Sequence, residues 1–169
     1  MKNKLIIYLL LLCPLIFLSS FLFTRYDFYF IPTGSMKPTI LAGDYVLVDT
    51  LAYQDSTPKR ADIILFNSPI ASNNVLIKRV FGIPDDKIAY SHSAPQLLAD
   101  STKILNSSKY DIHYVEPLHY FVLGDNFSGS QDSRYFSSFH QSEIIGKAVM
   151  IVLSQEADKS YHFTRVQKL

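Results

Sequence analysis

A run of 19 residues without a charge, Leu5–Phe23, constrains this chain more than any other feature. A helix of that length spans roughly 28 Å, which is close to the hydrocarbon thickness of a bilayer. Lys2 and Lys4 precede the run, and positive charge on that side favours a cytoplasmic amino-terminal end. We therefore expect a single transmembrane anchor in residues 1–24 and an extracytoplasmic domain in residues 25–169.

Two other interpretations fit the apolar run less well. A cleaved signal peptide needs an Ala-x-Ala type of site, which the nearest small residues, Ser19 and Ser20, do not form. A lipoprotein signal would use Cys13, but Leu12 precedes it and Pro14 follows it. Because Cys13 is the only cysteine, the rest of the chain has no thiol, which is compatible with an oxidising compartment.

Beyond the anchor, short apolar runs bounded by turn signals predict strands, and no long apolar period of 3.6 residues occurs. We expect a mainly β fold, in which the transmembrane helix is followed by a folded-over or closed β-sheet that limits exposed edges. The less regular residues 88–117 are predicted to form a small insertion. The predicted strands lie at residues 44–49, 63–66, 76–81, 120–123 and 148–153.

Four aromatic residues follow the anchor directly. Amphipathic rings collect at the headgroup level of a membrane, but aromatic residues are also common in the core of a strand. Both roles stay open, and different members of the group can fill each. The group consists of Tyr26, Phe28, Tyr29 and Phe30.

The composition excludes two classes of protein. Hydrophobic residues make up 48% of the chain and charged residues 18%, which is too apolar for a disordered chain. The net charge is +1 and no basic stripe is present, so there is no electrostatic case for nucleic acid as a partner. We expect neither a metal nor a cofactor.

Ser35 is a candidate nucleophile, because it lies in a turn shortly after the anchor. A serine hydroxyl needs a base to take its proton. The usual base is histidine, but none of the five histidines lies in a segment that looks like a catalytic loop. Ser35 also lacks a Gly-x-Ser-x-Gly elbow.

Lys78 is the best candidate for the base. The apolar residues around it, Val75–Phe81, can bury its amine, and burial lowers the pKa of a lysine by up to several units. Its neighbour Arg79 would point to the other face of the strand, toward solvent or a carboxylate. Lys37, next to Ser35, should stay hydrated and is a poorer candidate.

Taken alone, a serine in a turn and a lysine in an apolar strand are common structural features. Here they belong to ordered segments that read Pro-Thr-Gly-Ser-Met-Lys-Pro-Thr-Ile, then Ile-Lys-Arg-Val-Phe-Gly, then Gly-Asp-Asn and Asp-Ser-Arg. With these segments behind an anchor, the chain resembles the bacterial type I signal peptidases, the membrane-bound serine–lysine proteases. The resemblance covers somewhat under half of the chain, in residues 32–40 with 43–48, 60–69, 77–86, and 124–134 with 144–148.

The resemblance implies a role for each matched residue. Ser35 would be the nucleophile and Lys78 the general base, and the Ser35 N–H and Thr33 hydroxyl would form the oxyanion hole. Ser130 would orient the Lys78 amine through a hydrogen bond. The remaining support would come from an ion pair between Asp132 and Arg134 and from a turn formed by Gly124, Asp125 and Asn126.

Three positions depart from the family pattern. Phe127 stands in a box where charged and amide residues are frequent, so local polar support is reduced there. Asp85 follows Pro84 in place of a frequent glycine, and Ser137 also replaces a common glycine. None of these changes removes a catalytic group.

The family resemblance also implies a substrate. Family members cut secretory preproteins after a small residue, with another small residue two positions earlier, which requires two shallow apolar pockets. The substrate would lie extended along a strand edge, and the shared bilayer would raise its local concentration. The expected pocket residues are Ile31, Met36, Val46 and Ile77.

The expected function is therefore that of a signal peptidase with preproteins and the lipid bilayer as its partners. The expected location is the bacterial inner (cytoplasmic) membrane, with the catalytic domain extracytoplasmic or periplasmic. One alternative is a specialised relative that matures a dedicated substrate, such as a conjugative pilin. A non-enzymatic membrane-anchored scaffold and a self-cleaving repressor fit less well, the first because Ser35, Lys78, Ser130, Asp132 and Arg134 occur together.

Overall fold

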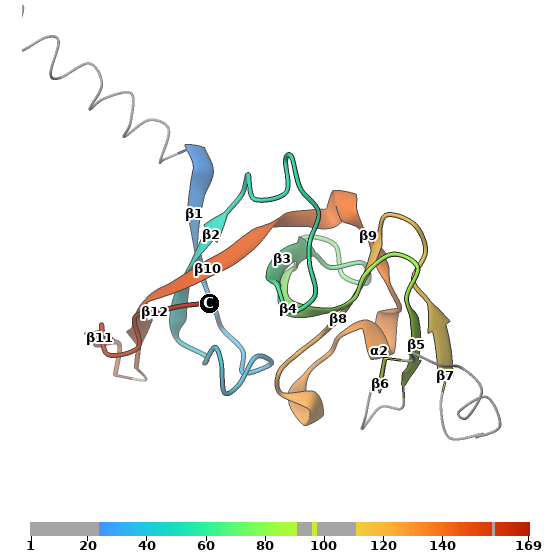
Figure 1. Ribbon diagram of the computed structural model, residues 1–169. Helices are drawn as coiled ribbons and strands as arrows, with labels where there is room; N and C mark the ends of the chain where they lie inside the picture. Colours follow the sequence, from blue (N-terminus) through green and yellow to red (C-terminus); the bar gives the residue numbers. More distant parts are fainter. Residues whose placement is uncertain (1–23, 91–95, 98–110, 157) are drawn as a thin grey trace, which may run out of the picture.

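The computed structural model describes residues 24–90, 96–97, 111–156 and 158–169 (Figure 1). All but the last residue of the predicted anchor, residues 1–24, lies outside the described residues. Within the described ranges, no helix has the length and apolar character needed to cross a membrane. The anchor therefore stays a prediction, as do the domain boundaries that depend on it.

The described part of the chain is mainly β, as predicted, and its larger sheet is antiparallel and has nine strands. The order along the main path is β1-β2-β10-β3-β4-β8-β9, and β11 and β12 also pair with β10. The strands are β1 (Tyr26–Phe30), β2 (Asp44–Asp49), β3 (Ile63–Asn67), β4 (Val75–Gly82), β8 (His119–Leu123), β9 (Phe139–His140), β10 (Ile144–Gln155), β11 (Tyr161–His162) and β12 (Gln167–Lys168).

The long strand β10 folds the sheet over on itself. Its residues Lys147–Ser154 pair with β2, and its residues Ile144–Lys147 pair with β3. Register shifts interrupt both pairings, and such bulges bend a strand and increase its twist. In Figure 1, β10 crosses the molecule diagonally, with β1 and β2 on one side and β3 and β4 on the other.

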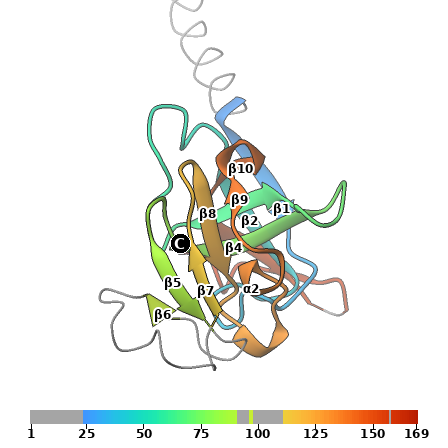
Figure 2. The ribbon, with the colours of Figure 1, turned by 90° about the vertical axis from the view of Figure 1, so that its right-hand side faces the viewer.

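A separate three-stranded sheet has the order β6-β5-β7. Its strands are β5 (Lys87–Tyr90), β6 (Gln96–Leu97) and β7 (Asp111–Tyr114), which fall in or beside the segment 88–117. Figure 2 shows β5 and β7 next to β8, and Ile88 of β5 packs with Phe121 of β8. The extent of the predicted insertion stays open, because residues 91–95 and 98–110 are outside the described ranges.

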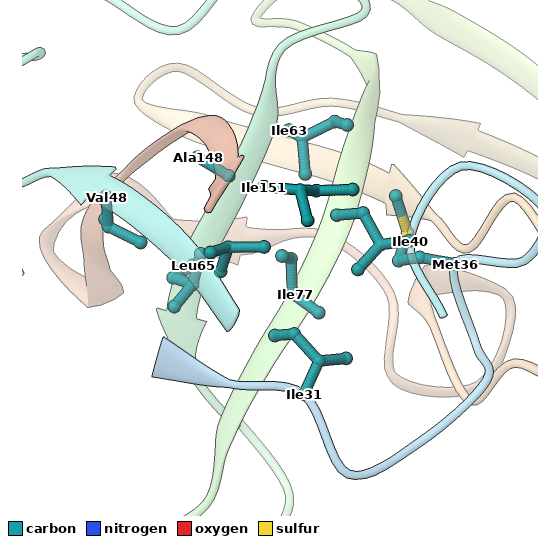
Figure 3. Packing of buried hydrophobic residues seen from close by; sticks show 10 residues of the cluster. Ile31, Met36, Ile40, Val48, Ile63, Leu65, Ile77, Ala148 and Ile151 are labelled. Atoms are coloured by element: carbon teal, nitrogen blue, oxygen red, sulfur yellow. The ribbon is translucent and has the colours of Figure 1, made fainter. Parts of the chain in front are cut away.

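The largest cluster of buried residues fills the space inside the folded sheet (Figure 3). On β2, Val46 and Val48 point inward while Leu47 between them is half-buried, which is the alternation expected of a strand. Burying one such side chain stabilises the fold by about 1.5–3 kcal/mol. The cluster contains Ile31, Met36, Ile40, Val46, Val48, Ile63, Leu65, Ile77, Ala148 and Ile151.

Apart from the helical residues Thr24 and Arg25, helical structure among the described residues is limited to single turns. The α-helix α2 (Ser133–Phe136) has Asp132 as its N-cap residue, and the Asp132 carboxylate accepts a hydrogen bond from the Arg134 N–H. This is the usual capping role of aspartate. The 3-10 turns η1 (Phe127–Gly129) and η2 (Gln141–Glu143) precede α2 and β10 respectively.

Candidate active site

The structure brings Ser35 and Lys78 into direct contact. The Lys78 Nζ lies 2.9 Å from the Ser35 Oγ and also donates to the Ile77 carbonyl at 2.8 Å. Both residues are buried, with exposed fractions of 7% for Ser35 and 3% for Lys78. A hydroxyl and an amine at this distance can exchange a proton directly.

Burial changes the chemistry of the amine. Lys78 lies on β4 between β3 and β8, and its removal from water lowers its pKa from 10.5 to about 8. The negative charge of Asp132 acts in the opposite direction and raises the same pKa. Desolvation is the larger effect, so a substantial fraction of Lys78 is neutral at mildly alkaline pH.

Ser35 lies in a loop between β1 and β2 that is held by a segment far along the chain. The Asn126 N–H donates to the Ser35 carbonyl at 3.0 Å, and the Asn126 side-chain amide donates to the Gly34 carbonyl at 3.0 Å. Within the loop, the Ile40 N–H donates to the Met36 carbonyl at 2.9 Å. These bonds fix the backbone on both sides of the serine.

Gly124 is required by a close approach of two backbone segments. A Cβ at this position would lie 2.5 Å from the Ser35 carbonyl oxygen and 2.2 Å from the Ser130 Oγ. Any side chain would therefore push the serine loop away. In the predicted turn of Gly124, Asp125 and Asn126, the glycine leaves room for the serine loop, and the asparagine donates hydrogen bonds to the backbone of that loop.

Asp125 connects the serine loop to the lysine strand. Its carboxylate accepts two hydrogen bonds from the Arg79 guanidinium, at 2.8 and 2.6 Å, and one from the Thr39 hydroxyl. Arg79 thus points away from Lys78 and toward a carboxylate, as the alternation of a strand requires. Burial raises the pKa of Asp125, but the bonds from Arg79 and Thr39 outweigh it and hold that pKa below its usual value.

Asp132 and Arg134 form an ion pair with both side chains fully buried and with the Arg134 Nε 2.8 Å from the Asp132 Oδ1. Burial raises the pKa of Asp132, but hydrogen bonds from Arg134 and from the Gly124 N–H lower it below its usual value. These donors already stabilise the Asp132 carboxylate, which limits how far its negative charge can raise the pKa of Lys78.

Ser130 is buried close to Gly124, but its hydroxyl has no hydrogen-bond partner among the described residues. The contacts of the Lys78 amine within the same part of the chain go to Ser35 and Ile77. The predicted bond from Ser130 to Lys78 is thus not formed in this structure.

A pocket of about 350 Å³ opens beside the Ser35–Lys78 pair. Ile31 and Ile77, two of the four residues expected in substrate pockets, line it, and so does the exposed Thr33. Met36 and Val46 do not line it, because they are fully buried in the core cluster. The other lining residues are Tyr29, Phe30, Pro32, Leu65, Asn73, Asn74, Val75 and Leu76.

Two parts of the site were not predicted from the sequence. Thr39 lies within the first matching segment, so its position in that motif was an available signal for its bond to Asp125. Asn73 and Asn74 also line the pocket, and an Asn-Asn turn signals only a loop.

A folded-over β-sheet with a buried serine–lysine contact beside an open pocket is an arrangement suited to hydrolysis. The sequence model of the family described as "Signal peptidase, peptidase S26" matches residues 1–153 of this chain. The chain therefore belongs to this family, and its relatives identify it as a bacterial type I signal peptidase.

Individual relatives agree with the family assignment. Signal peptidase I of Bacillus caldolyticus is 31% identical over 154 residues, which cover 80% of this chain and 82% of the relative. Signal peptidase I of Pseudomonas fluorescens is 29% identical over 195 residues, covering 80% and 69%. For Pseudomonas aeruginosa the identity is 29% over 180 residues, and the chain spans only 63% of that relative.

Among solved structures, a signal peptidase I from Enterococcus faecalis V583 is similar to this chain. The identity is 28%, the TM-score is 0.42, and the match covers 54% of this chain and 97% of the other.

The buried amine predicts an unusual effect on stability. In wild type, the folded state disfavours the charged form of Lys78, so its free energy of unfolding should rise as the pH passes from about 8 to 10.5. Lys78→Met removes this effect and should be more stable than wild type by up to about 3 kcal/mol below pH 8, with the gain shrinking above it. Denaturant unfolding between pH 6.5 and 10.5 measures the difference.

Lys147→Met is the matched control. Lys147 is paired with Asp62, so its loss should lower stability rather than raise it. A Lys78→Met variant that is less stable than wild type by the same amount at every pH would contradict the lowered pKa.

Proposed function

We propose that this protein is a membrane-anchored serine endopeptidase that removes signal peptides by a Ser35–Lys78 dyad, cutting after small residues. The observation that carries the proposal is the 2.9 Å contact between two buried side chains, together with the lowered pKa of Lys78. Neither feature is needed for the fold, since a buried lysine lowers stability.

The dyad would work in two half-reactions. Neutral Lys78 accepts the hydroxyl proton as the Ser35 Oγ attacks the scissile carbonyl carbon. The oxyanion that forms is stabilised by the Ser35 N–H and the Thr33 hydroxyl, and the Lys78 ammonium then protonates the leaving amine. Water, deprotonated by Lys78, hydrolyses the acyl-enzyme and releases the carboxylate of the signal peptide.

Two sheet edges support an extended substrate. Within the described residues, β1 pairs only with β2, and β4 pairs with β8 only from Arg79 onward. Residues that precede Ser35 and residues that precede Lys78 both line the pocket. A substrate strand would therefore lie between them, and its backbone could pair with either edge.

The shape of the pocket favours small side chains at alternate positions. In an extended peptide, residues two apart point to the same side. Ile31, Leu65 and Ile77 supply apolar surface there. A small residue at the cut and another two positions earlier would both face this surface.

Exposed aromatic residues support a position at the membrane. Phe28 and Phe30 lie on one face of β1 with exposed fractions of 65% and 46%, and Phe30 packs on Tyr45 of β2 at 5.1 Å between ring centroids. β1 begins two residues after the end of the predicted anchor. Such a face suits contact with lipid and would keep the dyad close to the bilayer.

Removal of either member of the dyad should abolish cleavage. Ser35→Ala and Lys78→Ala should each lower the rate of processing of an Ala-x-Ala preprotein by at least about a thousandfold, because the nucleophile or its base is lost. Cleavage is followed by gel shift and mass spectrometry of the mature amino terminus. Ser128→Ala and Lys87→Ala are the matched controls, and wild-type rates in either dyad variant would refute the mechanism.

The same assay separates the two candidate substrate classes. A purified enzyme that processes many preproteins is a general signal peptidase, and one that processes a single class, such as a pilin subunit, is a dedicated relative.

The rate should depend on the neutral fraction of Lys78. With a pKa of about 8, kcat/KM should rise about tenfold from pH 7 to pH 9 and level off above it. The rate falls on acidification because protonated Lys78 cannot accept the serine proton. A profile that is still rising steeply at pH 10, as for a solvated lysine, would contradict the proposal.

A further inference from the structure

A second set of contacts fixes the residues that follow Ser35, and it comes from the segment Arg165–Leu169, here named the strap. The Arg165 guanidinium donates to the Asp44 carboxylate through Nε and Nη2, both at 3.2 Å, and to the Thr39 carbonyl at 3.3 Å. The Gln167 side-chain amide donates to the same carbonyl at 3.4 Å.

Arg165 pairs with Asp44, a carboxylate that is buried at the end of the serine loop. The exposed fraction of Asp44 is 1%, and its carboxylate also accepts hydrogen bonds from the Leu41 N–H and the Ser154 hydroxyl. A buried carboxylate needs a countercharge, and Arg165 is the cation paired with it. Asp44 ends the serine loop and begins β2, so Arg165 acts on the end of that loop.

The strap itself is fixed to the core of the molecule. Its residues Gln167 and Lys168 form β12, which pairs with Ile151 and Met150 of β10. The Leu169 N–H donates to the Val149 carbonyl at 3.0 Å, and the Leu169 side chain packs against the cluster that contains Met36 and Ile40. The strap thus has a rigid base from which to hold the loop.

Thr39 links the strap to β4, the strand that carries Lys78, through hydrogen bonds. Its carbonyl accepts from Arg165 and Gln167, whereas its hydroxyl donates to Asp125. Asp125 is paired with Arg79, the residue after Lys78. Contacts therefore run from the strap through Thr39 to the strand that carries the proposed base.

From these contacts we infer that the strap sets the position of Ser35 relative to Lys78, and that Arg165 is a positioning residue for the reaction. The inference rests on the proposed function of the dyad. Small displacements of a nucleophile from its base reduce the rate of the chemical step far more than they reduce substrate binding. No residue of the strap lines the pocket, and the printed bonds of the Lys78 amine go to Ser35 and Ile77, so the effect of the strap should appear in kcat.

The test compares Arg165→Gln with wild type as full-length protein in detergent micelles. The kcat for an Ala-x-Ala preprotein should fall about tenfold or more, with KM changed less than about twofold, at a temperature where both proteins are fully folded. Arg165→Lys should recover part of the loss, because its ammonium can still pair with Asp44. Arg60→Gln, which breaks a different Arg–Asp pair outside the strap, should keep the wild-type kcat.

Hydrogen exchange supplies a readout that does not depend on activity. The amides of Ile40 and Leu41, which donate to the Met36 carbonyl and the Asp44 carboxylate, should exchange at least tenfold faster in Arg165→Gln. The amide of Val48, in the core of β2, should be unchanged.

Three results would overturn the inference: a kcat within twofold of wild type, unchanged exchange at Ile40 and Leu41, or equal acceleration at Val48, which would indicate general destabilisation. If wild type cleaves no preprotein, the proposed function fails, and the exchange data still decide whether the strap holds the loop.

Discussion

The site depends on the desolvation of the Lys78 amine, which lowers its pKa. Lys78 is held inside a sheet where its charged form is disfavoured, and the surrounding strands provide the stability that compensates for its burial. Asp132 is near enough to restore the charge, but its carboxylate is occupied by Arg134 and by the Gly124 N–H. These donors to Asp132 limit how far its charge raises the pKa of Lys78, and desolvation remains the larger effect.

The second requirement is a serine held at a fixed distance from that amine. The serine loop has little regular structure of its own, so its position depends on segments far along the chain. Asn126 holds the backbone at Gly34 and Ser35, and Arg165 holds the loop where it enters β2. The two supports come from different parts of the sheet: the strap pairs with β10, whereas Asn126 follows β8, which pairs with β4.

Local patterns in the sequence predicted the strands well, because alternation and turn residues act over a few positions. Residues 44–49 were predicted as a strand and form β2 with the same bounds, and residues 148–153 lie inside the longer β10. The mainly β fold is confirmed for the same reason. The two-residue strands β9, β11 and β12 carry too few residues to show a period of two, so only tertiary pairing defines them.

The candidate site could be predicted where a sequence motif and an apolar flank pointed to the same residue. An apolar flank around Lys78 indicated burial, and the structure places its amine against Ser35. Burial alone does not say which apolar residues face a pocket, so Met36 and Val46 proved to be core residues while Ile31 and Ile77 line the opening. The pairing of Arg165 with Asp44 spans 121 positions, and no local pattern can reveal it.

The most direct test of this account is the pKa of Lys78 itself. Titration of lysine side-chain ¹³Cε signals by NMR, with Lys78→Met to assign the resonance, measures it without substrate. The account predicts one lysine that titrates near pH 8 and is missing from the variant. A set of lysines that all titrate near 10.5, with the missing one among them, would contradict it.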